Sequence, residues 1–207
     1  MEKGMLTWEK GCRLVLASAS PRRKTLLSLL GIPFEVDPAQ GEEISKETRP
    51  AEKVLELSSH KAVEVLQRQA GNVVVLGADT VVACDGRIFG KPKDEENAKR
   101  MLRTLQGRTH QVYTGVSLLW RKDGEILEKH FYEETAVEFF PMTEDEIEGY
   151  VRTGEPMDKA GAYGIQGQGG LFVRGITGDY SNVVGLPVAR TFHELESWMG
   201  QTPHSAS

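Results

Sequence analysis

The 207-residue sequence predicts an α/β fold in which a mixed β-sheet carries helices on its faces. Apolar runs of strand length alternate along the chain with longer segments whose apolar residues have helical spacing. Two Asp-Gly pairs, Asp85-Gly86 and Asp123-Gly124, indicate tight hairpins. Hairpins join antiparallel strands and strand–helix crossovers join parallel ones, so we expect both kinds of pairing in one sheet.

The first third of the chain predicts two strand–helix pairs. The first strand is expected at Arg13–Ala17, and a helix follows from Pro21 to Leu30, with serine before it, proline at its first position and Gly31 as its stop. The second strand is expected at Pro33–Asp37, and leucines and valines at helical spacing predict a long amphipathic helix at Pro50–Gln69.

The middle of the chain predicts the main strands. Val73–Val82 is typical of a buried strand, which we expect to be interrupted by Gly77-Ala78-Asp79-Thr80. A helix is expected at Asp94–Gln106, with Gly107 as its stop. The next two strands are expected at Thr109–Trp120 and Ile126–Phe139, joined by the second Asp-Gly turn.

In the last third, Thr143 and Glu146 form a capping box for a helix that ends near Gly154. The remaining expected segments are a glycine-rich loop, a strand, a closing helix and a frayed tail, in that order: Ala160–Gly170, Leu171–Ile176, Leu186–Met199 and Gln201–Ser207.

Composition excludes several classes of protein. Hydrophobic residues make up 39% and charged residues 27%, which fits neither a membrane-embedded nor a disordered chain. The first residues lack a signal-peptide core, and two cysteines are too few for a disulfide framework, so we expect a cytoplasmic protein. The net charge of −5 argues against binding of a nucleic-acid backbone, and no apolar run is long enough to span a membrane.

The segment from Leu14 to Lys24 (LVLASASPRRK) is the first candidate site. Cations in the first turn of a helix oppose its dipole, typically by about 0.3–1 kcal/mol each, and such a broken rule is common at functional sites. Free N–H groups of the helix, the hydroxyls of Ser18 and Ser20, and the guanidinium groups of Arg22 and Arg23 would together suit a polyphosphate. The alternative is a capped helix with solvated basic residues.

Asp79 is the second candidate, because a carboxylate is rarely buried in an apolar strand without a partner. It would bind a metal, take a proton from water, or pair with a buried cation such as Lys91. Further acidic residues occur at Glu43 and Asp158, and sites with oxygen ligands alone suit Mg²⁺ or Mn²⁺. The five histidines show no paired spacing that would favour zinc.

Five motifs occur in a recognisable order: S-x-S-P-R-R at 18–23, G-A-D-T-V-V at 77–82, G-K-P at 90–92, D-K-A-G-A-Y-G-I-Q-G at 158–167 and N-V-V-G-L-P at 182–187. In this set and order the sequence resembles the Maf family. The resemblance implies a single catalytic domain at 13–200, preceded by an extension at 1–12 and followed by the tail at 201–207.

The resemblance also implies an activity and a fold. The activity is hydrolysis of a nucleoside triphosphate to the monophosphate and pyrophosphate with a divalent cation, Mg²⁺ or Mn²⁺. The fold is elongated, with two lobes around a cleft, and is related to that of inosine triphosphatase. A homodimer is implied as well. The subgroup that the chain resembles prefers dTTP and UTP.

By the same resemblance, Asp79 is the general base, and Arg22, Thr80 and Gln166 discriminate between substrates. The subgroup selective for 7-methyl-GTP has a bulky residue other than arginine, Gln and Glu at these three positions, so the chain departs from it at each. Other polar positions are expected to line the cleft: Ser18, Arg23, Glu43, Lys61, Lys91 and Asp158. We assign Asp79, Glu43 and Lys91 to catalysis, with Asp79 and Glu43 as metal ligands.

Three alternatives remain open at this point. Asp79 is either the base or a metal ligand whose metal acidifies the water. The substrate is either a pyrimidine nucleotide, normal or modified, or a non-standard purine triphosphate. A regulator of cell division that binds a nucleotide without hydrolysing it is the third alternative, although a buried carboxylate does not favour simple phosphate binding.

Overall fold

The computed structural model describes residue 6 and residues 8–200. Its strands are β1 (Arg13–Leu16), β2 (Glu35–Val36), β3 (Val73–Cys84), β4 (Arg87–Phe89), β5 (Thr109–Lys122), β6 (Glu125–Phe139) and β7 (Val173–Thr177). They form one sheet in the order β2-β1-β3-β5-β6-β7, with β4 paired to β3. β1 is parallel to β2 and β3, and the other pairs are antiparallel, which confirms the predicted mixed sheet.

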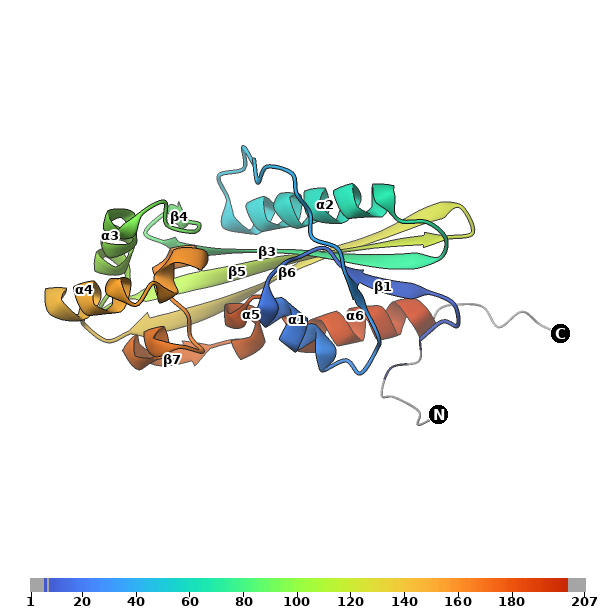
Figure 1. Ribbon diagram of the computed structural model, residues 1–207. Coiled ribbons are helices and arrows are strands. Elements are labelled where there is room, and N and C mark those ends of the chain that lie inside the picture. The colour runs from blue at the N-terminus through green and yellow to red at the C-terminus, as the bar shows by residue number, and fades with distance from the viewer. Residues whose placement is uncertain (1–5, 7, 201–207) are drawn as a thin grey trace.

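The helices are α1 (Pro21–Ser28), α2 (Pro50–Arg68), α3 (Glu95–Leu105), α4 (Glu144–Arg152), α5 (Tyr180–Val184) and α6 (Val188–Gly200), with 3₁₀ turns η1 (Glu155–Asp158), η2 (Ala160–Ala162) and η3 (Gln168–Phe172). Figure 1 shows α2 on one face of the elongated sheet and α1, α5 and α6 on the other. The helices α3 and α4 lie at one end of the long strands, and β1 lies at the other. In the described part of the chain, no helix has the length and apolar character needed to cross a bilayer.

The predicted helix signals act as expected. Ser20 caps α1 through its side chain, and Pro21 occupies the first helical position. Thr143 and Glu146 form the capping box of α4. Both predicted hairpins have positive φ at the Asp-Gly pair, as type I′ turns require, for example 49° at Asp85 and 73° at Gly86.

Three details of the prediction are wrong. β3 is continuous from Val73 to Cys84, so Gly77–Thr80 do not interrupt it but pair with Ser117–Thr114 of β5. The closing helix begins at Val188 rather than Leu186, and the short helix α5 before it was not predicted. The predicted tail lies outside the described residues, whereas Leu6 of the predicted extension packs into a hydrophobic core.

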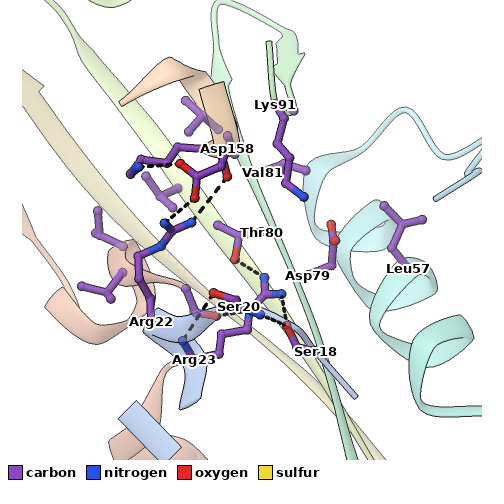
Figure 2. Close-up of a pocket in the computed structure, with 18 of the residues that line it drawn as sticks. Ser18, Ser20, Arg22, Arg23, Leu57, Asp79, Thr80, Val81, Lys91 and Asp158 are labelled. Carbon is purple, nitrogen blue, oxygen red and sulfur yellow. Dashed lines mark hydrogen bonds and ion pairs between the residues drawn. The ribbon is translucent and has the colours of Figure 1, made fainter. Parts of the chain in front are cut away.

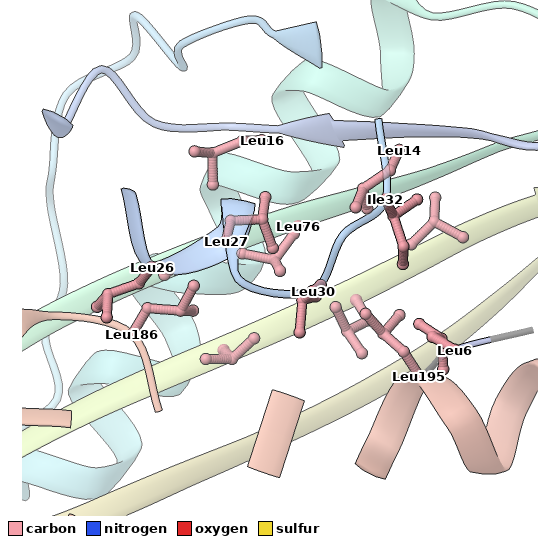
Figure 3. Close-up of a cluster of buried hydrophobic side chains, with 14 of the residues drawn as sticks. Leu6, Leu14, Leu16, Leu26, Leu27, Leu30, Ile32, Leu76, Leu186 and Leu195 are labelled. Atoms are coloured by element: carbon pink, nitrogen blue, oxygen red, sulfur yellow. The ribbon is translucent and has the colours of Figure 1, made fainter. Parts of the chain in front are cut away.

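The two faces of the sheet carry separate cores because side chains alternate along a strand. Val74 and Leu76 of β3 pack with α1 and α6 in the larger core, which Figure 3 shows around Leu27 and Leu186. Val73 and Val75 point the other way and pack with the α2 residues Ala62, Val65 and Leu66. A third core joins α3, α4 and η2 at the far end of the long strands.

Two glycines let α2 lie directly on the sheet. A Cβ atom at Gly77 would lie 2.2 Å from the carbonyl oxygen of Ser58, and one at Gly115 would lie 2.4 Å from that of Val54. No side chain larger than hydrogen fits at either position. The resulting contact fixes the distance between α2 and the middle of β3, where the candidate site lies.

Candidate functional site

The candidate site lies where one edge of β3 is open. β1 pairs with β3 only as far as Leu76, and β4 pairs with β3 only from Val82 onward. Residues 77–81 therefore have no strand partner on this side within the described structure. A cleft of about 890 Å³ occupies the gap, and it is lined by residues from both faces of β3 and from both ends of the sheet.

All the residues predicted for the site line this one cleft: Ser18, Ser20, Arg22, Arg23, Glu43, Lys61, Asp79, Thr80, Lys91, Asp158 and Gln166. Their individual roles stay predictions. Six cationic side chains line the cleft against four carboxylates, so the cleft is net positive although the chain has a charge of −5. A local excess of cations suits an anionic ligand.

Asp79 lies on the α2 face of β3 and is only 6% exposed. Its Oδ1 accepts a hydrogen bond from Lys61 Nζ at 2.6 Å, and the same ammonium lies 2.8 Å from Glu43 Oε1. The cation that pairs with Asp79 is therefore the half-buried Lys61, and the alternative pairing with Lys91 is wrong. Lys91 makes no ion pair with any described residue and points into the cleft beside Asp79 (Figure 2).

The loop that carries Glu43 is held against α2. Glu64 of α2 accepts hydrogen bonds from the backbone N–H groups of Gln40 at 2.7 Å and Gly41 at 2.9 Å. Burial works to raise the pKa of Glu43, but the hydrogen bond and charge of Lys61 outweigh it and lower that pKa overall. Glu43 thus remains a carboxylate at neutral pH.

Arg23 lies on the opposite face of β3, and three neutral acceptors hold its guanidinium group. Nε donates to the carbonyl oxygen of Gly185 at 2.8 Å, Nη1 to Ser18 Oγ at 3.2 Å and Nη2 to Thr80 Oγ1 at 3.0 Å. Burial lowers the pKa of Arg23, while the charges of Asp79 and Glu43 oppose that change. An anionic ligand would offset the remaining cost of burying this charge.

An ion pair spans the cleft between α1 and η1. Arg22 Nη1 lies 2.8 Å from Asp158 Oδ2, and Lys159 Nζ lies 2.6 Å from Oδ1 of the same carboxylate. Burial works to raise the pKa of Asp158, but the hydrogen bonds from Lys159 and Arg22 outweigh it and lower that pKa. The structure therefore brings Arg22 and Asp158 together, although 136 residues separate them.

The glycine-rich loop is organised by Glu155. Its carboxylate accepts hydrogen bonds from Tyr150 Oη at 2.8 Å and from the N–H groups of Gln168 at 2.9 Å and Gly169 at 3.2 Å. Gln166, in the middle of this loop, is exposed and makes no hydrogen bond to any described residue. Its amide is therefore available to a ligand.

Sequence reasoning missed four residues that contribute to the site. Lys53 and Lys159 add positive charge to the cleft, Glu155 holds the glycine-rich loop, and Thr114 contacts Thr80. Lys53 lies eight positions before Lys61, and this spacing places both residues on one face of a helix. The spacing could therefore have identified Lys53 as a residue of the cleft. Thr114 gives no local signal, because only the pairing of β3 with β5 brings it to Thr80.

The site offers few protein ligands for a metal. In the ranges that the structure describes, no three His, Cys, Asp or Glu side chains gather into a metal-binding group. Asp79 and Glu43 nevertheless face the same point, since both contact Lys61 Nζ. Two carboxylates fit Mg²⁺, which commonly completes its coordination with water and substrate phosphates.

Sequence comparisons identify close relatives. A family model described as Maf-like protein matches residues 13–198. The chain is 52% identical over 196 residues to a dTTP/UTP pyrophosphatase of Agathobacter rectalis, covering 88% of this chain and 96% of the relative. It is 50% identical over 192 residues to a dTTP/UTP pyrophosphatase of Bacillus pumilus, covering 92% of this chain and 98% of the relative.

Similarity to solved structures is more distant. The Ham1 protein of Staphylococcus aureus superposes with a TM-score of 0.39 at 16% identity, over 61% of this chain and 71% of that one. A nucleoside-triphosphatase, also described as a dITP/XTP pyrophosphatase, of Mycobacterium abscessus superposes with a TM-score of 0.35 at 15% identity, over 69% of this chain and 95% of that one.

Proposed function

This chain belongs to the Maf family, and on that premise we propose that it hydrolyses dTTP and UTP to the monophosphate and pyrophosphate. One observation carries the proposal. A carboxylate that is only 6% exposed, Asp79, lies in a cleft with an excess of cations, and only its Oδ1 has a partner among the described residues. One oxygen is held while the other is available to the reaction.

The cations of the cleft would bind the phosphate chain. Arg23 and Ser18 lie on one side of Asp79, and Lys91 lies on the other with its ammonium in the cleft (Figure 2). The N-terminus of α1 adds free N–H groups beside them. These donors would stabilise charge on the triphosphate and on the departing pyrophosphate.

The reaction follows from the position of Asp79. Its free oxygen orients a water molecule and accepts a proton from it as the water oxygen bonds to the α-phosphorus. The bond from the α-phosphorus to the bridging oxygen breaks, and pyrophosphate leaves with that electron pair. Lys61 meanwhile holds the other oxygen of Asp79 in place.

A divalent cation would be held by Asp79 and Glu43 together with substrate phosphates, and when bound it neutralises phosphate charge and acidifies its water. Because Lys61 contacts both carboxylates, it would have to give way partly to such a cation. A homodimer and a cytoplasmic location remain predictions.

Selectivity for the base is assigned to Gln166. Uracil and thymine present an acceptor at O4 beside a donor at N3, and a glutamine amide offers the matching donor and acceptor. Cytosine reverses this edge, and once a bound base buries the amide, a polar group without a partner costs about 1–3 kcal/mol, or roughly 5- to 150-fold in discrimination. We therefore expect dTTP and UTP to be hydrolysed well above CTP, with ATP and GTP poor substrates.

A panel of nucleoside triphosphates, assayed for pyrophosphate release with Mg²⁺, tests the proposal. Release from dTTP and UTP above all others is expected. Preference for inosine or xanthosine triphosphate would instead support the purine alternative. Calorimetric binding of UTP without any release would support a nucleotide-binding regulator.

A further inference from the structure

The hydroxyl of Thr80 lies between a cation and a second hydroxyl. Its Oγ1 accepts a hydrogen bond from Arg23 Nη2 at 3.0 Å and lies 2.9 Å from Thr114 Oγ1. Thr114 Oγ1 in turn lies 3.0 Å from the backbone carbonyl oxygen of Asn182. Arg23, Thr80, Thr114 and Asn182 thus form a polar chain that begins at the cleft and ends inside the protein, where Thr114 and Asn182 are fully buried.

The direction of the protons in this chain follows from its last member. A carbonyl oxygen can only accept, so Thr114 must donate its single proton to Asn182. Thr114 then has only lone pairs to offer Thr80, and Thr80 must donate its own proton to Thr114. The single proton of the Thr80 hydroxyl is therefore used in the hydrogen bond to Thr114. None is left to donate to a carbonyl group of a nucleotide base.

The buried end of the chain is itself fixed. Asn182 Nδ2 donates to the carbonyl oxygen of Val112 at 3.0 Å and to Thr135 Oγ1 at 2.9 Å. Asn182 is thereby attached to both β5 and β6. The backbone carbonyl oxygen of Asn182 also accepts the N–H of Gly185 at 3.0 Å, so the acceptor that sets the proton direction of Thr114 and Thr80 is held in place.

Arg23 gains its orientation from the same arrangement. Three of its five N–H groups are directed to neutral acceptors, and the other two have no partner among the described residues. No carboxylate among these residues accepts a hydrogen bond from Arg23, so the anion that this cation lacks would come from the ligand. Loss of the Thr80 oxygen would release one side of the guanidinium group.

We infer that Thr80 and Thr114 are positioning residues that hold Arg23 toward the phosphates of the substrate, and that Thr80 does not read the base through its hydroxyl proton. The inference rests on the proposed function only in taking the ligand to contain phosphates. It separates Thr80 from Gln166, whose free amide retains the role of contacting the base.

Binding of inorganic pyrophosphate with Mg²⁺, measured by calorimetry, tests the inference because this probe has no base. Hydrogen bonds to charged groups contribute enough that we expect Thr80→Val to weaken pyrophosphate binding about 10-fold or more. Thr114→Val should weaken it in the same direction, and Thr80→Ser, which keeps the hydroxyl, should restore most of it. Thr191→Val is the matched control, since among the described residues this buried hydroxyl bonds only to the carbonyl oxygen of Pro187, directly before its own helix.

Hydrolysis provides the second readout. Thr80→Val should lower kcat/KM for UTP and CTP by the same factor, because phosphates carry no base identity. Unchanged or tighter pyrophosphate binding by folded Thr80→Val, or a changed UTP-to-CTP ratio at normal pyrophosphate affinity, would overturn the inference. So would a wild-type chain that binds no pyrophosphate. If the wild type binds pyrophosphate but hydrolyses no nucleotide, the proposed function fails and the comparison of affinities still decides the inference.

Discussion

Asp79 and Thr80 are neighbours in the sequence, yet they organise opposite faces of the sheet in different ways. Around Asp79 the contacts are ionic, with Lys61 shared between two carboxylates. Around Thr80 the contacts are hydrogen bonds from Arg23 to neutral acceptors, with a proton direction fixed by a backbone carbonyl group. An ammonium can exchange a carboxylate for a phosphate or make room for a metal, whereas the hydroxyl chain has one arrangement. Under the proposed function, the side chains around Asp79 carry out the reaction and those around Thr80 hold Arg23 in position.

Removal of divalent metal should have the largest effect on turnover, because the proposed metal ligands, Asp79 and Glu43, both belong to the ionic cluster around Lys61. We expect EDTA to abolish hydrolysis and Mg²⁺ or Mn²⁺ to restore it, since the candidate ligands are all oxygens. The thermal unfolding temperature should barely change, because Lys61 still pairs with both Asp79 and Glu43. Restoration by Zn²⁺ alone would contradict the choice of ligands.

Asp79→Asn should cause the second largest loss of hydrolysis rate. Loss of a positioned base typically lowers the rate about 10²- to 10⁴-fold, and the substitution keeps the shape of the side chain. Pyrophosphate release under saturating UTP measures the loss. Asp85→Asn is the matched control, since Asp85 lies in an exposed hairpin turn whose positive φ suits asparagine equally well. Near-normal turnover by folded Asp79→Asn would remove this residue from the mechanism.

A third test protonates a buried histidine on the face of the sheet that carries Thr80. His110 is fully buried there beside Tyr163, and burial lowers its pKa from 6.5 to about 4. Below pH 6.5 the unfolded chain takes up a proton that the folded chain excludes, so stability should fall as the pH decreases from about 6.5 to 4. The pKa difference corresponds to about 3 kcal/mol at the lower limit.

Urea unfolding at pH 7 and pH 4.5 would measure this loss. His110→Phe should remove most of the histidine's share of the pH dependence, while His193→Gln, at an exposed position, should keep it. Equal pH dependence of the wild type and His110→Phe would show that protonation of His110 does not cause the loss of stability.

The smallest effect is expected where α2 meets the sheet. Gly115→Ala would place a Cβ atom 2.4 Å from the backbone of Val54, and overpacking of this kind typically costs about 1–3 kcal/mol. Displacement of α2 should also lower turnover, because Lys61 would move away from Asp79. Gly149→Ala on α4, where a new Cβ would meet nothing within 4 Å, should leave both stability and turnover unharmed. Normal turnover by Gly115→Ala would separate the helix contact from the reaction.

Local chemistry made much of this molecule predictable. Ser20 and Pro21 indicated the start of α1, the Asp-Gly pairs indicated both hairpins, and the carboxylate in an apolar strand indicated Asp79. The predictions that were wrong concern residues whose contacts lie far away in the sequence. The glycine at 77 resembles an interruption in sequence, but it serves the contact with Ser58 of α2.

The cation that pairs with Asp79 was missed for the same reason. Lys91 is nearer in sequence, but the glycine contact brings Lys61 to the carboxylate. The polar chain from Thr80 to Asn182 joins β3, β5 and the helix α5, and its members lie up to 102 positions apart in the sequence, so no local sequence pattern could reveal it.

In β3, odd-numbered and even-numbered residues of the site face opposite sides of the sheet. Asp79 opposes Gly115 and Thr80 opposes Thr114, and successive side chains on a strand alternate between faces. Deleting one residue from β3 ahead of this pair would present the carboxylate to Arg23 and the hydroxyl to Lys61. Deleting two would return each to its own side. An odd change of length ahead of this pair therefore exchanges the two halves of the site at once, whereas an even change keeps each side chain on its own face.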